Sequence, residues 1–330
     1  MKLSTTYLGL KLRNPLIVGA SPFADHLHAA SQLQDAGAAA IVMRSLFEEQ
    51  IDQEQRALVH HTESVAESHA EATSYFPAVA DYQLTPDHYL RQIEQLKGML
   101  AIPVIASLNG CRPGGWTGYA QKFAGAGADA IELNLYQLVT DPSRPADQVE
   151  ADMLETVRSV TGAVKIPVAV KISAFHTSPA NFVRRLEDAG AAGVVIFNRF
   201  YQTDFNLEEM EVQSLLKLSD QSELLMRLRW LAILSPHSRG SLAATGGVHT
   251  ADDVVKAILA GAHTVQLVSV LLQQGPRFLS VLLNDLQHWM REHSYESVDQ
   301  MRGAMNLSRC PDPAGFERAN YQRMLQSWRV

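Results

Sequence analysis

Cysteine is scarce in this sequence of 330 residues. Cys111 and Cys310 are its only cysteines, too few for a disulfide framework or for a zinc or iron–sulfur site held by this chain's cysteines. Such usage fits a reducing compartment, and we expect a cytoplasmic protein. A His-Glu-x-x-His motif and a tight cluster of His and Asp are also missing, so no metal site is expected.

Long apolar runs and runs of basic residues are missing as well. Charged residues and prolines interrupt every apolar stretch before it reaches about 18 residues, so no membrane-spanning helix is predicted. The N-terminal stretch MKLSTTYLGLKLRNPL lacks the apolar run and cleavage site of a signal peptide. The 28 Lys and Arg residues, against 35 Asp and Glu, give a formal net charge of −7 and form no basic run. Neither nucleic acid nor a membrane is therefore expected as a partner.

Short apolar runs instead alternate with longer amphipathic ones. The apolar runs predict strands at 14–21, 39–45, 102–108, 128–135, 166–173, 192–198, 240–247 and 263–269. The amphipathic runs predict helices at 26–37, 86–99, 116–127, 146–162, 178–190, 223–234, 250–260 and 276–291. Apolar strands separated by helices indicate a parallel sheet covered by helices. Eight such units over roughly 270 residues predict a (β/α)₈ TIM barrel.

Four of the joins between helix and strand share a glycine. They read Asp35-Ala-Gly37, Gly125-Ala-Gly127-Ala-Asp129, Asp188-Ala-Gly190 and Leu259-Ala-Gly261-Ala-His263. Glycine at this place is expected to end the helix in the left-handed conformation. A doubly wound open sheet is the alternative fold, but GASPFAD after the first strand is not the G-x-G-x-x-G turn that such a sheet needs for a dinucleotide.

Three segments lie outside the repeat. Residues 46–85 form a long polar insertion after the second strand, which we expect to be a lid or an interface. Residues 199–222 form a second insertion, after the sixth strand. The barrel would occupy 1–291, and 292–330 would be a C-terminal helical extension.

Polar groups stand at the ends of all eight predicted strands, where barrels gather their chemistry. They are Ala20-Ser21, Arg44-Ser45, Ser107 to Asn109, Asn134, Lys171, Asn198, Thr245-Gly246-Gly247 and Ser269. Taken singly, Asn134 could equally cap a turn, and Ser21 before Pro22 fits ordinary turn chemistry better than a functional role. Lys171, within VAVKIS, needs a partner or a function if it faces the barrel interior. Together these groups indicate a polar ligand in the barrel mouth.

The stretch ATGGVHTADD (244–253) narrows the kind of ligand. Two glycines let backbone N–H groups approach an anion, and barrels commonly bind phosphate after strands seven and eight. VQLVSVL (265–271) would supply the second half of such a cradle. A phosphorylated ligand or cofactor is therefore expected.

With these motifs in place, residues 3–291 resemble the dihydroorotate dehydrogenase family of FMN-containing barrels. The resemblance rests on GLKLRNPLIVGASP, IELNL, VAVKIS, IFNR, and TGGV followed by LAGAHTVQLVSVLLQQGP. CPDPAGFERANY, in the tail, is similar to a bacterial subgroup described as dihydroorotate dehydrogenase-like.

The resemblance implies FMN as the cofactor. Its phosphate would lie at Gly246, Gly247 and the Val268-Ser269 turn, next to Thr245, and Lys171 would stabilise the negative charge of the reduced ring. The other cofactor-binding residues implied are Ala20, Ser21, Arg44, Ser45, Asn109, Asn134 and Asn198. Arg44 replaces a family lysine, which keeps the charge but changes its reach.

The position of the catalytic base departs from the family pattern. Where the family has Cys or Ser, this sequence has Gln137, and an amide is not a competent general base. Tyr136, with an ordinary pKa near 10, and His176 are the possible substitutes.

Two classes of function follow from this departure. The first is FMN-dependent oxidation of dihydroorotate to orotate in pyrimidine biosynthesis, or a related CH–CH oxidation or reduction. The second is a flavin-binding electron-transfer protein or a catalytically divergent homologue that acts on a different substrate. A non-flavin phosphate-binding barrel, with Lys171 forming a Schiff base, is a third alternative. The expected partners are a small anionic substrate, an electron-transfer protein and a second copy of the chain in a homodimer.

Overall fold

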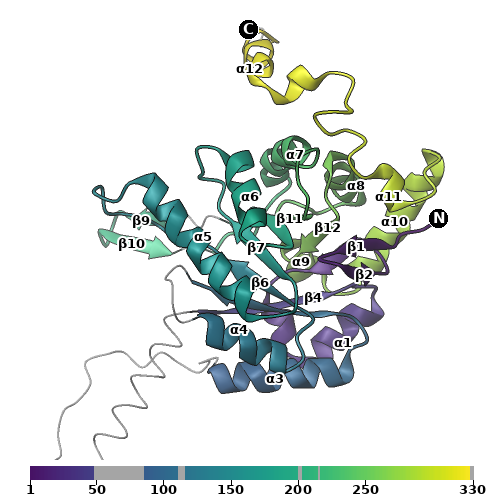
Figure 1. The fold of residues 1–330 in the computed structure, drawn as a ribbon. Helices are drawn as coiled ribbons and strands as arrows, with labels where there is room; N and C mark the ends of the chain where they lie inside the picture. Colours follow the sequence, from purple (N-terminus) through teal and green to yellow (C-terminus); the bar gives the residue numbers. More distant parts are fainter. Residues whose placement is uncertain (48–84, 111–115, 200–202, 215, 328–330) are drawn as a thin grey trace, which may run out of the picture.

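Eight parallel strands close into a barrel in this computed structural model, which describes residues 1–47, 85–110, 116–199, 203–214 and 216–327 (Figure 1). The strands follow the order β11-β12-β3-β4-β5-β6-β7-β8 around the barrel. Their bounds are Leu16–Val18 (β3), Ile41–Phe47 (β4), Val104–Asn109 (β5), Ala130–Asn134 (β6), Val168–Ile172 (β7), Gly193–Ile196 (β8), Ser241–Thr245 (β11) and Thr264–Leu267 (β12). The predicted (β/α)₈ barrel is confirmed.

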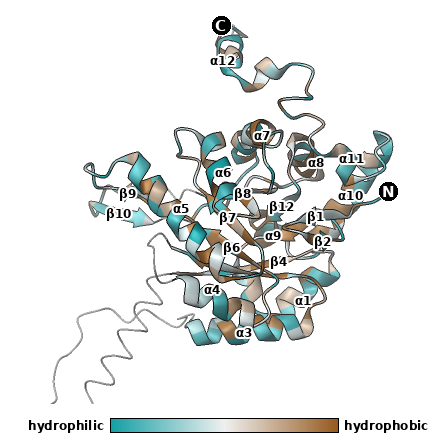
Figure 2. Ribbon diagram, viewed as in Figure 1, coloured by the Kyte–Doolittle hydropathy of each residue, from teal (hydrophilic) through white to brown (hydrophobic). Residues whose placement is uncertain are grey.

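Helices cover the outside of the barrel. They are α1 (Leu27–Asp35), α3 (Pro86–Met99), α4 (Trp116–Gly125), α5 (Ala146–Ala163), α6 (Pro179–Asp188), α7 (Ser222–Leu234), α8 (Ala251–Ala260) and α10 (Phe278–Glu292). Each follows a barrel strand, and their apolar faces turn toward the strands while hydrophilic faces turn outward (Figure 2). Both ends of each predicted helix lie within about two residues of the observed ones, as fraying of helix ends allows.

The predicted strand 263–269 is wrong at its end. Strand β12 stops at Leu267, and Ser269 is the first residue of a further helix, α9 (Ser269–Gln274). The chain turns at Val268, whose φ of −135° and ψ of −68° leave the strand conformation. The Val268 carbonyl then accepts a hydrogen bond from the Leu272 N–H, as in a first helical turn.

The four glycine joins have the expected conformation. Gly37, Gly127, Gly190 and Gly261 have φ between +95° and +125°. Other residues are sterically hindered there, so glycine lets the chain reverse directly from a helix into the next buried strand.

A hairpin that the sequence pattern did not predict closes the N-terminal end of the barrel. It comprises β1 (Thr5–Tyr7) and β2 (Leu10–Leu12). Tyr7 and Leu8 are buried in one cluster with inward-facing side chains of the barrel strands. The Leu8 N–H donates a hydrogen bond to the Ser241 Oγ, at the start of β11, at 3.0 Å. Strands of three residues are too short for a period-two pattern to reveal them.

The two other segments outside the repeat are only partly described. The insertion 46–85 lies almost entirely outside the described residues, as does Cys111. The segment 199–222 contains an exposed hairpin of β9 (Thr203–Asn206) and β10 (Glu211–Ser214). Beyond α10 come α11 (Val298–Met301), the 3-10 helix η2 (Pro313–Phe316) and α12 (Arg318–Ser327), which has no buried residue and stands away from the barrel (Figure 1). Among the described residues, no helix has the length and apolar character needed to cross a bilayer.

Candidate functional site at the barrel mouth

Three predicted site residues lie at one level of the barrel, at the C-terminal ends of adjacent strands. Asn109 pairs in register with Asn134, and Asn134 with Lys171. Each faces inward because its neighbours along the strand, such as Leu133 and Ile172, pack outward against the helices. Asn109, Asn134 and Lys171 are between 6% and 9% exposed. The mouth is therefore lined by polar groups that are largely withdrawn from water.

The Asn134 side chain is oriented by a second predicted residue. The Asn198 Nδ2 donates to the Asn134 Oδ1 at 2.8 Å. Because this bond occupies the carbonyl oxygen, the Nδ2 group of Asn134 is left to donate to a ligand. The structure therefore joins the chain ends of β6 and β8 through two residues that the sequence placed at the barrel mouth.

Lys171 has an acidic partner, Glu132, that was not among the predicted site residues. The Lys171 Nζ lies 3.5 Å from the Oε1 of Glu132, and the Gln266 Nε2 donates to the Oε2 at 2.5 Å. Glu132 is 1% exposed. The motif IELNL could have identified Glu132 as a site residue, because Glu132 stands two residues before Asn134 and must face the same side of the strand.

The ends of β4 and β5 are joined by hydroxyl groups. The Ser45 and Ser107 Oγ atoms lie 2.7 Å apart, both buried. The Tyr89 hydroxyl accepts from the Ser107 N–H at 2.8 Å, and burial raises the pKa of Tyr89 above its ordinary value. These hydrogen bonds hold β4 and β5 together on one side of the barrel mouth.

The residues predicted at the ends of β3 and β4 have different surroundings. The Arg44 guanidinium forms an ion pair of 2.6 Å with Asp25, in the 3-10 helix η1 (Pro22–Asp25). Burial raises the pKa of Asp25, and Arg44 opposes that shift. Ala20 is half-buried, and the Ser21 Oγ is buried with no hydrogen-bond partner among the described residues. A buried hydroxyl without a partner is the kind of atom that a ligand would satisfy.

The Thr-Gly-Gly turn after β11 has the conformation that only glycine adopts easily. Gly246 and Gly247 have φ of +86° and +81°. A Cβ atom on Gly246 would lie 2.9 Å from the Arg227 Nη2, and one on Gly247 would lie 2.4 Å from the Leu224 backbone N. The first turn of α7 therefore packs directly on this loop.

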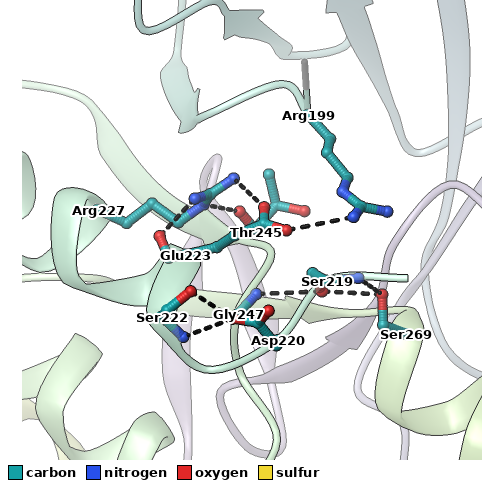
Figure 3. Close-up of polar contacts among 9 residues, drawn as sticks. All are labelled: Arg199, Ser219, Asp220, Ser222, Glu223, Arg227, Thr245, Gly247 and Ser269. Atoms are coloured by element: carbon teal, nitrogen blue, oxygen red, sulfur yellow. Dashed lines mark hydrogen bonds and ion pairs between the residues drawn. The ribbon is translucent and has the colours of Figure 1, made fainter. Parts of the chain in front are cut away.

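Ser219 joins the two predicted phosphate loops, and the sequence alone did not reveal it. Its Oγ accepts from the Gly247 N–H at 3.3 Å and lies 2.8 Å from the Ser269 Oγ, and its own N–H donates to that Ser269 atom at 3.0 Å (Figure 3). Ser219 is 4% exposed. The chain before α7 thus meets the loops after β11 and β12, which places three backbone segments around one point.

Two arginines flank this point and share one carboxylate. Arg227 is 3% exposed, and its Nε donates to the Thr245 carbonyl while its Nη2 lies 3.5 Å from Glu223. Arg199 lies 3.3 Å from the other oxygen of Glu223 (Figure 3). Burial lowers the pKa of Arg227, and Glu223 opposes that shift. Arg199 and Arg227 together carry one more positive charge than Glu223 neutralises, and a guanidinium binds anions well.

The residues at the expected base position line a pocket that begins directly after the end of β6. Tyr136 and Gln137 are half-buried in the wall of a pocket of about 480 Å³ between the loops after β6 and β7. His176 lines the same pocket, but its ring stacks on Phe182 at 4.0 Å and its Nδ1 lies 3.4 Å from Glu150. Burial lowers the pKa of His176. Its imidazole therefore packs against α5 and α6.

The Gln137 side chain has an unsatisfied atom. Its Oε1 is buried and has no hydrogen-bond partner within the part of the chain that the structure describes. An amide so placed can donate or accept a hydrogen bond, but it cannot take a proton at neutral pH.

The described residues contain no group of three or more His, Cys, Asp or Glu that could hold a metal ion.

The chain is similar to known proteins over most of its length. A family model described as dihydroorotate dehydrogenase matches residues 2–290. A putative dihydroorotate dehydrogenase A (fumarate) of Aeropyrum pernix is 26% identical over 215 residues, which cover 62% of this chain and 67% of that protein. The catalytic subunit of dihydroorotate dehydrogenase B (NAD(+)) of Thermoplasma volcanium is 23% identical over 312 residues, covering 91% and 97%.

A relative with another named activity matches over a similar length. The PreA subunit of the Escherichia coli K12 NAD-dependent dihydropyrimidine dehydrogenase is 22% identical over 333 residues, which cover 94% of this chain and 78% of that protein. The relatives are dehydrogenases, and two of them are named as subunits. The match over nearly the whole chain, on a closed barrel with a polar mouth, establishes that this protein belongs to the dihydroorotate dehydrogenase family of oxidoreductases.

Proposed function

We propose that this protein is an FMN-dependent oxidoreductase that transfers a hydride between the flavin and a small, planar, anionic substrate. The relatives' names suggest two substrate classes, dihydroorotate and dihydropyrimidines. Both reactions would oxidise or reduce a carbon–carbon bond next to a carbonyl group. Of the two, we propose dihydroorotate or a close analogue first.

The observation that carries the proposal is the pairing of a polar mouth with an anion cradle. The cradle consists of the N–H groups at Gly246 and Gly247 and the hydroxyl groups of Ser219 and Ser269, with Arg199 nearby. A Cβ atom at Gly246 would meet the Arg227 guanidinium and one at Gly247 the Leu224 backbone, so glycine at both positions lets the loop lie against α7. These donors suit the FMN phosphate, because backbone N–H groups, hydroxyl groups and a guanidinium all bind phosphate oxygens.

The mouth suits the flavin ring for a similar reason. Lys171 would stand beside the ring, and the amides of Asn109 and Asn134 would bind ring or substrate oxygens. The unpartnered Ser21 Oγ offers one more hydrogen bond at the end of β3. Bound FMN would supply a two-electron hydride acceptor.

In this mechanism the chain positions the reactants and stabilises charge. Asn198 donates to the Asn134 Oδ1 and so leaves the Asn134 Nδ2 to donate to the ligand, and the Lys171 ammonium would stabilise negative charge that develops beside it. Val268 and Thr245 shape the loops that hold the phosphate. The proton acceptor that we propose is Tyr136, two residues after Asn134, since Gln137 cannot act as a base.

The cofactor is tested by the visible absorption spectrum of the purified protein after FMN is added and excess FMN is removed. The two flavin bands should remain with the protein. Their absence would refute the flavin-based function. If flavin is bound, dihydroorotate under anaerobic conditions should bleach it, and dihydrouracil provides the test of the dihydropyrimidine class.

Gln137 favours a second candidate, a flavin-binding protein that exchanges electrons with a partner protein or acts on a different substrate. A chain that binds FMN and is bleached by dithionite, but not by dihydroorotate, would support this candidate. Two relatives are named as subunits, which fits a protein partner for electron transfer. We also propose that the chain forms a homodimer in the cytoplasm, which gel filtration with light scattering and cell fractionation would test.

A further inference from the structure

Glu132 lies inside the barrel, directly below the polar mouth. It is 1% exposed and sits two residues before Asn134 on the same face of β6. Lys171, from β7, and Gln266, from β12, each contact one of its carboxylate oxygens, at 3.5 Å and 2.5 Å. A carboxylate with so little exposure is tolerated where both its charge and its lone pairs are matched.

Gln266 is itself held in place beside this carboxylate. A Cβ atom at Gly19, the residue after β3, would lie 3.3 Å from the Gln266 Cβ, so the chain at the end of β3 packs closely against Gln266. The Tyr7 hydroxyl, from the N-terminal hairpin, is buried without a hydrogen-bond partner among the described residues. Burial raises the pKa of Tyr7, and the charge of Glu132 raises it further. Tyr7 therefore remains neutral, and the charge that meets Glu132 is that of Lys171.

The positions of Lys171 and Glu132 determine the electrostatic potential at a ligand in the barrel mouth. The Lys171 ammonium is the nearer charge, and Glu132 stands behind it with the opposite sign. Since the Coulomb energy falls with distance, the positive charge dominates but is reduced by the negative one. The contact also fixes the end of a side chain with four rotatable carbons, which would otherwise move freely.

We propose that Glu132 is a positioning residue that holds the Lys171 ammonium at the mouth and limits the positive charge that Lys171 presents to the flavin. This inference rests on the proposed FMN site. Reduction places negative charge on the flavin near Lys171. Glu132 therefore lowers the reduction potential of the bound flavin, compared with a Lys171 that has no carboxylate behind it.

The test is the midpoint potential of FMN bound to the full-length chain, measured by anaerobic titration against a reference dye. Glu132→Gln keeps the shape and a hydrogen-bonding group but removes the charge, so the potential should become more positive. A tenfold gain in the preference for reduced over oxidised flavin corresponds to about 29.6 mV for a two-electron couple. Glu132→Asp retains the charge and should restore a potential close to that of the wild type.

A double-mutant cycle with Lys171→Met shows whether Glu132 acts through Lys171. In the Lys171→Met background, Glu132→Gln should shift the potential less than in the wild-type background, because only the direct effect of the carboxylate on the flavin remains and no ammonium is left to be held. If the Glu132→Gln single variant fails to fold, Glu132→Met, which has a similar length and no charge, takes its place in both backgrounds. A smaller shift in the Lys171→Met background supports the proposal, and equal shifts in the two backgrounds overturn it.

Two outcomes separate this inference from the proposed function. If the wild type binds flavin but Glu132→Gln has the wild-type potential, or shifts it equally in both backgrounds, the role of Glu132 is refuted and the flavin function stands. If the wild type binds no flavin, both are refuted.

Discussion

At the scale of single residues, Lys171 illustrates how burial changes the effect of a charged side chain on stability. Its ammonium lies 3.5 Å from Glu132, and both groups are largely withdrawn from water. An ion pair of this kind adds little stability in itself, but loss of one partner leaves the other charge buried and unpaired. Substitutions at Lys171 therefore affect stability as well as the proposed chemistry.

The first prediction concerns this pair. Lys171→Ala should lower the free energy of unfolding by about 3 kcal/mol, because Glu132 loses its counter-charge inside the barrel. Urea unfolding followed by circular dichroism measures the change. The matched control is Lys171→Met combined with Glu132→Gln, which removes both charges and should recover most of the loss. Equal stability of Lys171→Ala and the wild type would contradict the proposed pairing.

The second prediction concerns His263, which lies between α8 and β12. Its Nδ1 accepts a hydrogen bond from the Leu242 N–H at 3.0 Å. Burial, with a smaller effect of Arg302, lowers its pKa to about 4. The unfolded chain therefore binds a proton more readily than the folded one. Stability from this group is complete above about pH 6.5 and is lost as the pH falls toward 4, by at most about 3 kcal/mol.

Urea unfolding between about pH 4 and pH 7.5 tests this dependence, a range that spans the folded and unfolded pKa values. His263→Asn retains an acceptor but cannot titrate, so its stability should vary less with pH over this window. The exposed His28→Asn serves as the control for the substitution and should keep the wild-type profile. A His263→Asn profile identical to that of the wild type would rule out this role of His263.

At the scale of secondary-structure elements, helix α7 carries the part of the site that joins its loops. Its first turn packs on Gly247, and the chain just before it places Ser219 between Gly247 and Ser269. Asp220 accepts from the Ser222 N–H at 2.8 Å, and hydrogen bonds from Ser222 lower the pKa of Asp220. The start of α7 is thereby fixed against both phosphate loops.

The third prediction concerns this contact. Gly247→Ala places a Cβ atom 2.4 Å from the Leu224 N and demands a positive φ. We expect the free energy of unfolding to fall by about 2 kcal/mol or more, since the left-handed conformation alone costs about 1–2 kcal/mol. FMN affinity should fall more than tenfold, which titration of FMN fluorescence would measure.

Gly98→Ala is the matched control for that substitution. Gly98 lies at an exposed position of α3, and a Cβ atom added there would have no neighbouring atom within 4 Å. Alanine at this position should raise the stability by about 0.5–1 kcal/mol, because glycine is the weaker helix former. Wild-type stability and FMN affinity in Gly247→Ala would be incompatible with the proposed cradle.

At the scale of the whole molecule, ligand binding and folding are linked. A ligand that binds the native barrel and not the unfolded chain stabilises it by about 2.7 kcal/mol at one hundred times its dissociation constant. We predict this increase for FMN in urea unfolding. Riboflavin at the same concentration should stabilise the chain much less, because it lacks the phosphate that Gly246, Gly247 and Ser269 are proposed to bind. Equal effects of the two flavins would place the binding energy outside the phosphate loops.

Much of the architecture could be predicted from local pattern. The alternation of apolar and amphipathic runs predicts strands and helices in the right order, and the glycines at the joins have the expected positive φ. Inward-facing positions follow from the alternation along each strand, which also places Asn134 and Lys171 at the mouth. The N-terminal hairpin, by contrast, has strands too short to give such a pattern.

The barrel and the polar ends of its strands were determined by the sequence, because both depend on periodicity between near neighbours in the chain. The tertiary structure decided which of those polar groups meet. Glu132 contacts Gln266 across 134 positions of sequence, Ser219 enters the cradle from an irregular segment, and Arg44 pairs with Asp25. These partners depend on closure of the barrel and on the path of its loops, which no local pattern encodes.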